Sequence, residues 1–286
     1  MNDWATLLAR CTFPPPGTTV TCAVSGGADS LALLVLAVAA GCRATAVHVD
    51  HGLRPGSADE ADIVCSAAAR LGATFRAEKA DVALGPNLEA RARAARYAVL
   101  PPDVLTGHTA DDQAETVLLN LVRGAGLDGL AGMRRQNHPI LSLRRHDTEA
   151  VCEAEGLAPF TDPTNVDAVY RRNRVRAELL PLLGDIAQRD VVPVLARQAA
   201  LLRDEADALD TLATALDPTD ARELASAPLA LARRAVRRWL VQGEDHPPDA
   251  ATVERVLAVA RNEAKAADVG GGRRVLRTRN VLRLEH

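Results

Sequence analysis

A short glycine-containing turn near the start of the chain carries residue types that bind phosphate. Residues 24–30 read Val-Ser-Gly-Gly-Ala-Asp-Ser and join a β-branched apolar run to an apolar segment of helical character. The start of a helix offers unpaired N–H groups and a partial positive charge, and paired glycines let an anion approach the backbone closely. We therefore predict a phosphate-binding loop formed by Ser25, Gly26, Gly27, Ala28, Asp29 and Ser30.

Two common phosphate motifs are excluded at this turn. A Walker P-loop requires a lysine directly after a glycine, and neither Lys79 nor Lys265 has a glycine before it. The dinucleotide pattern Gly-x-Gly-x-x-Gly is missing as well. The alternative to a phosphate loop is an ordinary strand-to-helix turn in which Asp29 caps the helix.

Acidic residues gather after the fourth predicted strand. Thr109 suits a helix N-cap, and Asp111 and Glu115 share one flank of the helix that begins there. Carboxylates beside bound phosphate are unfavourable without a cation, and Mg²⁺ commonly bridges carboxylates and nucleotide phosphates. The pattern predicts a Mg²⁺ site formed by Asp29, Asp111 and Asp112. The alternative is that the two neighbouring aspartates only stabilise the helix dipole.

A third polar segment follows the second predicted strand. His48, Asp50 and His51 are metal ligands by type, but an extended chain points the first two to one side and His51 to the other. We therefore predict that His48 and Asp50 line the nucleotide pocket and do not form a separate metal site.

The elements that position these residues alternate between strands and helices. Strands are predicted at residues 19–24, 43–49, 74–78, 103–107 and 139–143. Helices are predicted at residues 31–40, 57–71, 88–100 and 111–123, with an acidic helix after the fifth strand. This alternation predicts an α/β fold with a doubly wound parallel sheet, in which ligands bind beyond the carboxyl ends of the strands.

The second part of the chain has a different pattern. Helical periodicity is predicted at residues 191–216, 221–241 and 251–262, followed by alternating apolar and basic residues that are typical of a hairpin. We therefore predict two domains, a catalytic domain at residues 1–185 and a smaller helical domain at 186–286. Four arginines of the second helix either face a nucleic acid or pair with the acids of residues 204–217. They are Arg233, Arg234, Arg237 and Arg238.

Composition excludes several classes of protein. The chain has 286 residues, 48% of them hydrophobic, which is enough for a large core. Five cysteines without a Cys-x-x-Cys pair argue against a disulfide framework, a zinc knuckle or a cluster site. No apolar run has membrane-spanning length and no signal pattern is seen, so we expect a cytoplasmic protein that does not bind membranes.

Positive charge is local, because the formal net charge is −3. The densest basic run contains no intervening carboxylate, unlike a solvated helix face. It consists of Arg171, Arg172, Arg174 and Arg176. This run predicts a patch that binds the phosphates of a nucleic acid.

The turn at residues 25–30 resembles the Ser-Gly-Gly-x-Asp-Ser loop of the PP-loop ATP pyrophosphatases, which activate a substrate by adenylation. Further blocks resemble, in order, the tRNA(Ile)-lysidine synthetase family. They lie at residues 48–54, 87–93, 96–97, 107–116, 120–126, 129–133, 162–165, 171–176 and 180–183. Their combination is far more specific than any single block.

This resemblance implies a two-step reaction with ATP and Mg²⁺ as cofactors. ATP adenylates the 2-carbonyl oxygen of the wobble cytidine in the CAU anticodon of tRNA(Ile), and free L-lysine then displaces AMP to give lysidine. Partners would be tRNA(Ile), L-lysine and ATP, in an enzyme that often forms homodimers. By resemblance the catalytic residues are Asp29, Arg93, His108, Asp112 and Glu115. The division of metal binding and lysine recognition among His108, Asp111, Asp112 and Glu115 stays open, and the arginine run and the second domain are expected to contact tRNA.

Other functions fit the residues less well. A tRNA 2-thiocytidine synthetase needs cysteines at Cys-x-x-Cys spacing, and a glutamine amidotransferase needs a nucleophilic cysteine where position 2 has Asn2. NAD synthetase lacks the arginine-rich second half. A non-catalytic binding module has no need of the acidic residues Asp29, Asp111 and Glu115, and the absence of Mg²⁺-dependent pyrophosphate release would identify it.

Overall fold

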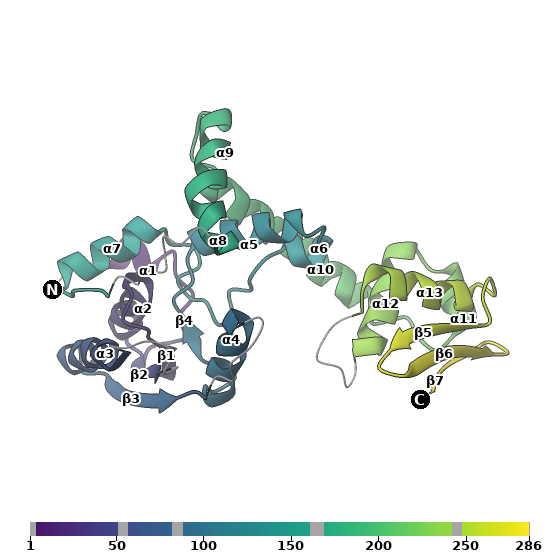
Figure 1. Ribbon diagram of the computed structural model, residues 1–286, viewed down its shortest axis with the longest axis horizontal. Coiled ribbons are helices and arrows are strands. Elements are labelled where there is room, and N and C mark those ends of the chain that lie inside the picture. The colour runs from purple at the N-terminus through teal and green to yellow at the C-terminus, as the bar shows by residue number, and fades with distance from the viewer. Residues whose placement is uncertain (1–3, 51–56, 82–87, 161–168, 242–247, 286) are drawn as a thin grey trace. The chain divides into compact units, whose positions relative to one another are not determined.

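The computed structural model describes residues 4–50, 57–81, 88–160, 169–241 and 248–285, and the side chains of residues 57–59 and 88–90 are also left undescribed. The chain divides into two compact units, Met1–Leu201 and Leu202–His286 (Figure 1). Residues 186–201, which we expected in the second domain, lie in the first unit. There Val192 of helix α10 (Val192–Ala213) packs against Ala110 and Ala114.

The first unit is built on a parallel sheet with the strand order β3-β2-β1-β4. The strands are β1 (Thr19–Ala23), β2 (Arg43–Asp50), β3 (Thr74–Lys79) and β4 (Leu105–Thr106). Cys22 of β1 pairs with Ala46 on one side and with Leu105 on the other. The chain runs outward from β1 to β3 and then returns to the opposite side of β1, so the sheet has its topological switch point between β1 and β4. The predicted doubly wound parallel sheet is confirmed.

Side chains of β2 alternate between the two faces of the sheet and so belong to two apolar layers. Ala44 and Ala46 join the main core, while Val47 and Val49 pack on the other face with Leu100 and Val104. Between the strands run helices α2 (Ala28–Ala39), α3 (Ser57–Leu71) and α4 (Leu88–Val99), with the short α1 (Ala5–Leu8) before β1. The leucines of α2 are fully buried, as expected for a helix that is apolar on all sides.

The predicted strand at residues 139–143 is wrong, because these residues form consecutive turns. The N–H of Leu141 donates to the carbonyl of His138 (3.1 Å), and that of Leu143 donates to the carbonyl of Ile140 (2.9 Å). Ile140 and Leu143 are nevertheless fully buried in the main core. The apolar run therefore reflects burial of side chains and not pairing in the sheet. The acidic helix that we expected next is α7 (Arg145–Ala154).

Helix α5 (Ala110–Val122) begins where predicted. The N–H and the hydroxyl of Thr109 both donate to Oδ2 of Asp112, at 2.9 and 3.1 Å, which fixes the first turn. The remaining helices of this unit are α6 (Leu127–Leu130), α8 (Arg171–Arg174), a π-helix (Val175–Leu179) and α9 (Leu180–Ala187). Among the described residues, no helix is long and apolar enough to cross a membrane.

The second unit combines helices with a small antiparallel sheet. Its elements after α10 are α11 (Ala221–Ser226), α12 (Leu229–Val241), α13 (Ala250–Ala260), β5 (Ala266–Gly270), β6 (Arg273–Thr278) and β7 (Val281–Glu285). The single helix predicted at 221–241 is interrupted at Pro228, which lacks the N–H that a continuous helix requires. Core side chains come from both helices and strands and include Leu224, Val236, Leu240, Leu257, Val275 and Leu282.

Candidate active site

A cavity of about 400 Å³ lies at the carboxyl ends of β1 and β4, at the switch point of the sheet. The turn after β1 and the turn after β4 both contribute to its wall. The predicted residues that line it are Ser25, Gly27, Ala28, Asp29, Ser30, His108, Asp112 and Arg176. Side chains that sequence reasoning did not assign to a site also line it, among them Arg96, Tyr97, Arg145 and Phe160. The fold thus brings the phosphate-loop prediction and part of the acidic prediction into one cavity.

The glycine-containing turn is held by its own serines. The N–H of Ser25 donates to Oγ of Ser30 (3.1 Å), whose hydroxyl donates to the carbonyl of Gly27 (2.9 Å). Gly26 has φ +85°, a left-handed conformation that favours glycine. Gly27 is the N-cap of α2, so the first N–H groups of that helix are available to an anion.

Gly107 brings the second turn against the first. A Cβ at this position would lie 2.6 Å from the carbonyl oxygen of Asp29, closer than real Cβ contacts. Only glycine allows this approach of the two turns, so the glycine at the end of β4 is a steric requirement of the site.

His48 and Asp50 occupy places other than the cavity wall. His48 is 2% exposed, and its Nδ1 lies 3.1 Å from the carbonyl oxygen of Val24. Val47 and Val49 line the cavity in their place, because side chains alternate along β2. Asp50 is half-buried at the end of the strand, and His51 lies outside the described residues. His48, within β2, therefore contacts the chain directly before the phosphate loop.

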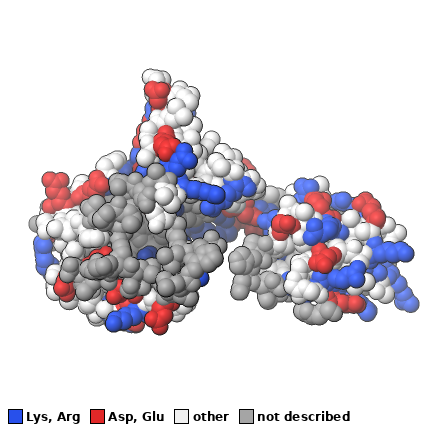
Figure 2. Space-filling view, in the orientation of Figure 1, with Lys and Arg blue, Asp and Glu red and all other residues white. Residues whose placement is uncertain are grey.

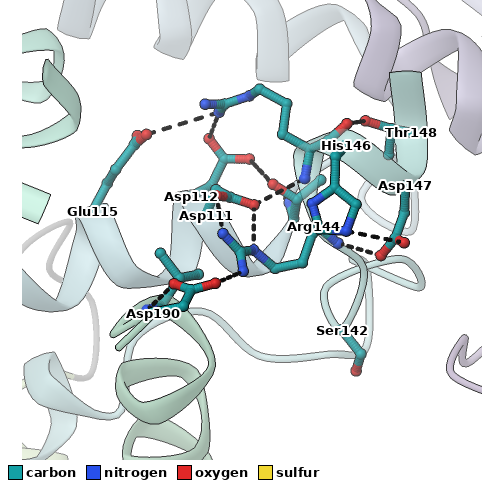
Figure 3. A network of polar contacts seen from close by, with 12 residues as sticks. Asp111, Asp112, Glu115, Ser142, Arg144, His146, Asp147, Thr148 and Asp190 are labelled. Carbon is teal, nitrogen blue, oxygen red and sulfur yellow. Dashed lines mark hydrogen bonds and ion pairs between the residues drawn. The ribbon is translucent and has the colours of Figure 1, made fainter. Parts of the chain in front are cut away.

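Asp29 is a half-buried carboxylate in the cavity wall, and its pKa is raised. Burial raises its pKa to about 6, and repulsion from Asp112 acts in the same direction. A hydrogen bond from the Thr148 hydroxyl to Oδ1 and the charge of Arg145 act against this rise. The remaining oxygen, Oδ2, lies 3.7 Å from Nε of Arg145 (Figure 3 shows the surrounding network).

Asp111 is held by the start of α7. Nε and Nη2 of Arg144 donate to its two oxygens at 3.0 and 3.1 Å, and the backbone N–H of Arg145 adds a bond of 2.9 Å (Figure 3). Burial acts to raise the pKa of Asp111, but the hydrogen bonds from Arg144 and Arg145 outweigh it and hold the pKa below its usual value. Both oxygens of Asp111 are therefore already occupied, and Asp111 does not line the cavity.

Glu115 is fully buried among guanidinium groups. Arg176 donates to both of its oxygens, at 2.7 and 3.2 Å, and Nε of Arg172 lies 3.1 Å from Oε2. Its side chain is 0% exposed, so its charge depends on these partners for stabilisation. Asp112 keeps Oδ1 facing Arg145 at 3.7 Å and Arg176 at 4.0 Å.

His108 shares a hydroxyl with a second histidine. Oγ1 of Thr106 lies 2.7 Å from Nδ1 of His108 and 2.6 Å from Nδ1 of His138, and the two rings meet edge to face at 4.7 Å. Burial lowers the pKa of His108 to about 4, and burial also lowers that of His138. The His108 ring is therefore neutral near pH 7.

The basic run that we predicted as one patch has two orientations. Arg172 and Arg176 point inward to Glu115, and Arg172 also donates to Oγ1 of Thr116 (3.0 Å). Arg171 and Arg174 are exposed, and Arg174 pairs with Glu178 at 2.7 Å. Only these two are placed to meet a phosphate from solvent.

Arg93 lies on the exposed side of α4. Its guanidinium carbon is 5.0 Å from the centre of the Tyr97 ring, which lines the cavity. Arg93 thus reaches the site through the neighbouring Tyr97 side chain.

The block at residues 162–165, which carried part of the family resemblance, lies outside the described residues.

The arginines of α12 mostly pair within the second unit. Arg233 contacts Glu254 of α13, Arg234 contacts Asp210, and Arg238 donates to the carbonyl of Ala213 (3.1 Å). Figure 2 shows acidic side chains interspersed with basic ones over this unit. Of these contacts, the one between Arg234 and Asp210 is the kind that the ion-pair alternative predicts, since Glu254 lies outside residues 204–217 and Arg238 bonds a backbone carbonyl.

Sequence reasoning missed the contribution of α7. Arg144, Arg145 and Thr148 contact Asp111, Asp112, Glu115 and Asp29 across the cavity. Their sequence signal is weak, because one arginine beside another suggests a surface patch. The useful signal is position, since they follow directly after a buried apolar segment at the edge of the sheet.

The donor set fits Mg²⁺ at two carboxylates. Among the described residues, no group of three or more His, Cys, Asp and Glu side chains is arranged to hold a metal ion. Mg²⁺ in nucleotide sites uses one or two carboxylates and takes its remaining ligands from phosphates and water. Oδ2 of Asp29 and Oδ1 of Asp112 meet that need, because both approach the same Arg145 group in the cavity.

Comparison with known proteins defines the class first. Residues 4–183 match the family model described as the PP-loop domain. A solved structure titled U34-tRNA thiolase NcsA from Methanococcus maripaludis has a similar fold, with a TM-score of 0.53, 18% identity, and coverage of 66% of this chain and 73% of that one. The chain is thus a PP-loop protein, a class that uses ATP.

Relatives narrow the class to a family. The chain is 42% identical over 281 residues to the tRNA(Ile)-lysidine synthase of Nocardia farcinica, covering 91% of this chain and 88% of the relative. It is 46% identical over 242 residues to that of Mycobacterium leprae, covering 77% and 74%. The chain belongs to the tRNA(Ile)-lysidine synthase family, and the resemblance inferred from its motifs is confirmed.

Proposed function

We propose that this chain is a tRNA(Ile)-lysidine synthase. It uses ATP to adenylate the wobble cytidine of tRNA(Ile) bearing the CAU anticodon, and free L-lysine then displaces AMP. The observation that carries this proposal is the cavity lined both by the glycine-containing turn and by His108 and Asp112 after β4. A binding module would have no use for a half-buried carboxylate with a raised pKa beside a phosphate loop.

The first step depends on holding the triphosphate of ATP. The N–H groups at the start of α2 and the hydroxyl of Ser25 bind the departing pyrophosphate and stabilise its growing charge, while Ser30 holds the turn through Gly27. Asp29 and Asp112 would hold Mg²⁺, which neutralises charge on the leaving group when it is bound. Asp111 contributes indirectly, because it fixes Arg144 and the first turn of α7.

The second step needs recognition of a cationic amine. Asp112 lines the cavity with Oδ2 held by Thr109, whereas Glu115 is fully buried behind it and bound to Arg176. Asp112 is the carboxylate that can meet the lysine amine directly, and Glu115 contributes through Arg176, which also lines the cavity. His108 is neutral and lines the same cavity, so it provides a hydrogen-bonding wall without repelling the amine.

The exposed arginines Arg171 and Arg174 are the proposed contacts to tRNA phosphates, since Arg172 and Arg176 are engaged with Glu115. The second unit is proposed to contact tRNA as well. We further propose a cytoplasmic enzyme that forms a homodimer.

Labelled lysine provides the direct test. Purified protein is incubated with ATP, Mg²⁺, radiolabelled lysine and a tRNA(Ile) transcript bearing CAU, and label retained in the tRNA is counted. We expect incorporation with the native chain and none with Asp29→Ala, while Asp103→Ala, a change on the exposed surface, retains it. Pyrophosphate release without incorporation would keep the adenylation step and reject lysine as the nucleophile. If neither labelled tRNA nor pyrophosphate is formed, the chain is a binding module and the proposal is rejected.

A further inference from the structure

Arg145 differs from the other arginines that contact the carboxylates. Arg144 and Arg176 each make two hydrogen bonds of 2.7–3.2 Å to one carboxylate. The nitrogens of Arg145 instead lie 3.7 Å from Asp29, 3.7 Å from Asp112 and 3.8 Å from Glu115. These separations are longer than hydrogen bonds, so Arg145 is attracted to three carboxylates by charge and is fastened to none of them.

The position of this guanidinium coincides with that of the expected metal ion. Each of the two proposed Mg²⁺ ligands has one oxygen engaged elsewhere, Asp29 with Thr148 and Asp112 with Thr109. The two remaining oxygens are the ones that face Arg145. A single cation therefore already stands between the two oxygens that a metal would use.

Arg145 also has space to move. It lines the nucleotide cavity and a second cavity of about 310 Å³, which is lined by Glu115, Arg176, Leu180 and Val192 among others. The guanidinium thus forms part of the wall between two hollows. A side chain that is held only by charge and is flanked by open space can leave its place at low cost.

We propose that Arg145 is the internal counter-cation of this site, which neutralises Asp29 and Asp112 in the nucleotide-free enzyme and is displaced when Mg²⁺ arrives with ATP. The inference rests on the proposed function, since it takes Asp29 and Asp112 as the metal ligands. Arg145 acts as a positioning residue that keeps the repelling carboxylates together. It also keeps the site from binding free metal ions before the nucleotide is present.

Metal binding without nucleotide tests this role. Protein-bound Mn²⁺, used in place of Mg²⁺, is measured by electron paramagnetic resonance with no ATP present. Removing a positive charge 3.7 Å from both ligand oxygens should tighten Mn²⁺ binding by on the order of tenfold or more in Arg145→Ala. Arg145→Lys keeps the charge and should bind Mn²⁺ as weakly as the native chain.

Two further variants make the result specific. Arg10→Ala removes an arginine that pairs with Asp147 on the same helix, away from the carboxylates of the cavity, and should leave Mn²⁺ affinity unchanged. Adding Asp29→Asn to Arg145→Ala should abolish the tight binding. If Arg145→Ala fails to fold, Arg145→Gln removes the charge while preserving the length of the side chain, and circular dichroism confirms folding before each titration.

The outcomes separate the two proposals. One outcome is that folded Arg145→Ala binds Mn²⁺ with the affinity of the native chain and still binds it in the presence of α,β-methylene ATP. This would overturn the proposal that Arg145 is displaced by the metal, but it would leave the proposed metal site standing. No Mn²⁺ bound by any form, even with the nucleotide analogue, would overturn both. A lower melting temperature without tighter Mn²⁺ binding would mean that Arg145 has only a structural role.

Discussion

Neutralising Glu115 is expected to destabilise the first unit strongly, because its buried carboxylate is the shared partner of two half-buried arginines. Glu115→Gln keeps the shape of the side chain and removes its charge. Arg172 and Arg176 would then lose their common anion while remaining mostly inside the protein. Breaking a buried pair in this way costs about 3–5 kcal/mol. We expect a value near the lower end, since these two side chains keep 34% and 31% of their surface exposed.

An exposed pair on the same segment gives the matched control. Glu178 accepts two hydrogen bonds from Arg174, at 2.9 and 2.7 Å, so its geometry is close to that of the Glu115–Arg176 pair. Both residues are largely exposed, and water screens the interaction. Glu178→Gln should therefore unfold at nearly the same urea concentration as the native chain.

Urea unfolding of the metal-free protein measures both changes. The chain has two tryptophans, Trp4 in the first unit and Trp239 in the second, so a Trp239→Phe background makes fluorescence report on the first unit alone. The free energies of unfolding then compare Glu115→Gln with Glu178→Gln directly. Equal losses for the two variants would refute the argument that burial makes Glu115 the stronger contributor.

Three further predictions test the loop, its packing and the surface. With its pKa near 6 in the folded state, against an ordinary value of 3.8, Asp29 favours the folded state at low pH. This contribution is lost as pH rises through 6. Urea unfolding should therefore show Asp29→Asn gaining up to about 2 kcal/mol on the native chain between pH 4.5 and 7.5. Gly107→Ala should lose about 1–3 kcal/mol through its contact with the Asp29 carbonyl, whereas Gly126→Ala, with open space around it, should melt like the native chain. Changing both Arg171 and Arg174 to alanine should weaken tRNA binding, measured by filter binding. The slope of log affinity against log salt concentration should fall by the amount expected for about two phosphate contacts, and ATP affinity should be unchanged.

Local sequence patterns predicted the sheet and the two turns well. The Ser-Gly-Gly turn and the Thr109 cap lie close to the strand ends that precede them, so their contacts are set within a few residues. The error at residues 139–143 came from the same kind of reasoning. An apolar run reports burial, and Ile140 and Leu143 are buried without pairing in a sheet.

The pairing of charges could not be read from the sequence. Arg144 finds Asp111 and Thr148 finds Asp29 only because the fold brings α7 against the loops after β1 and β4. Separations of 33 and 119 residues carry no periodic signal. His138 escaped notice for the same reason, since its link to His108 runs through the Thr106 hydroxyl.

The alternating directions of the basic run at residues 171–176 have a consequence for protein engineering. Arg172 and Arg176 bind the buried carboxylate of Glu115, whereas Arg171 and Arg174 are exposed and can be substituted without changing a contact of Glu115. Affinity for a polyanion can therefore be adjusted at the two outer positions independently of the interior. A charge-reversal library at these two positions would vary surface potential over an unchanged reaction centre.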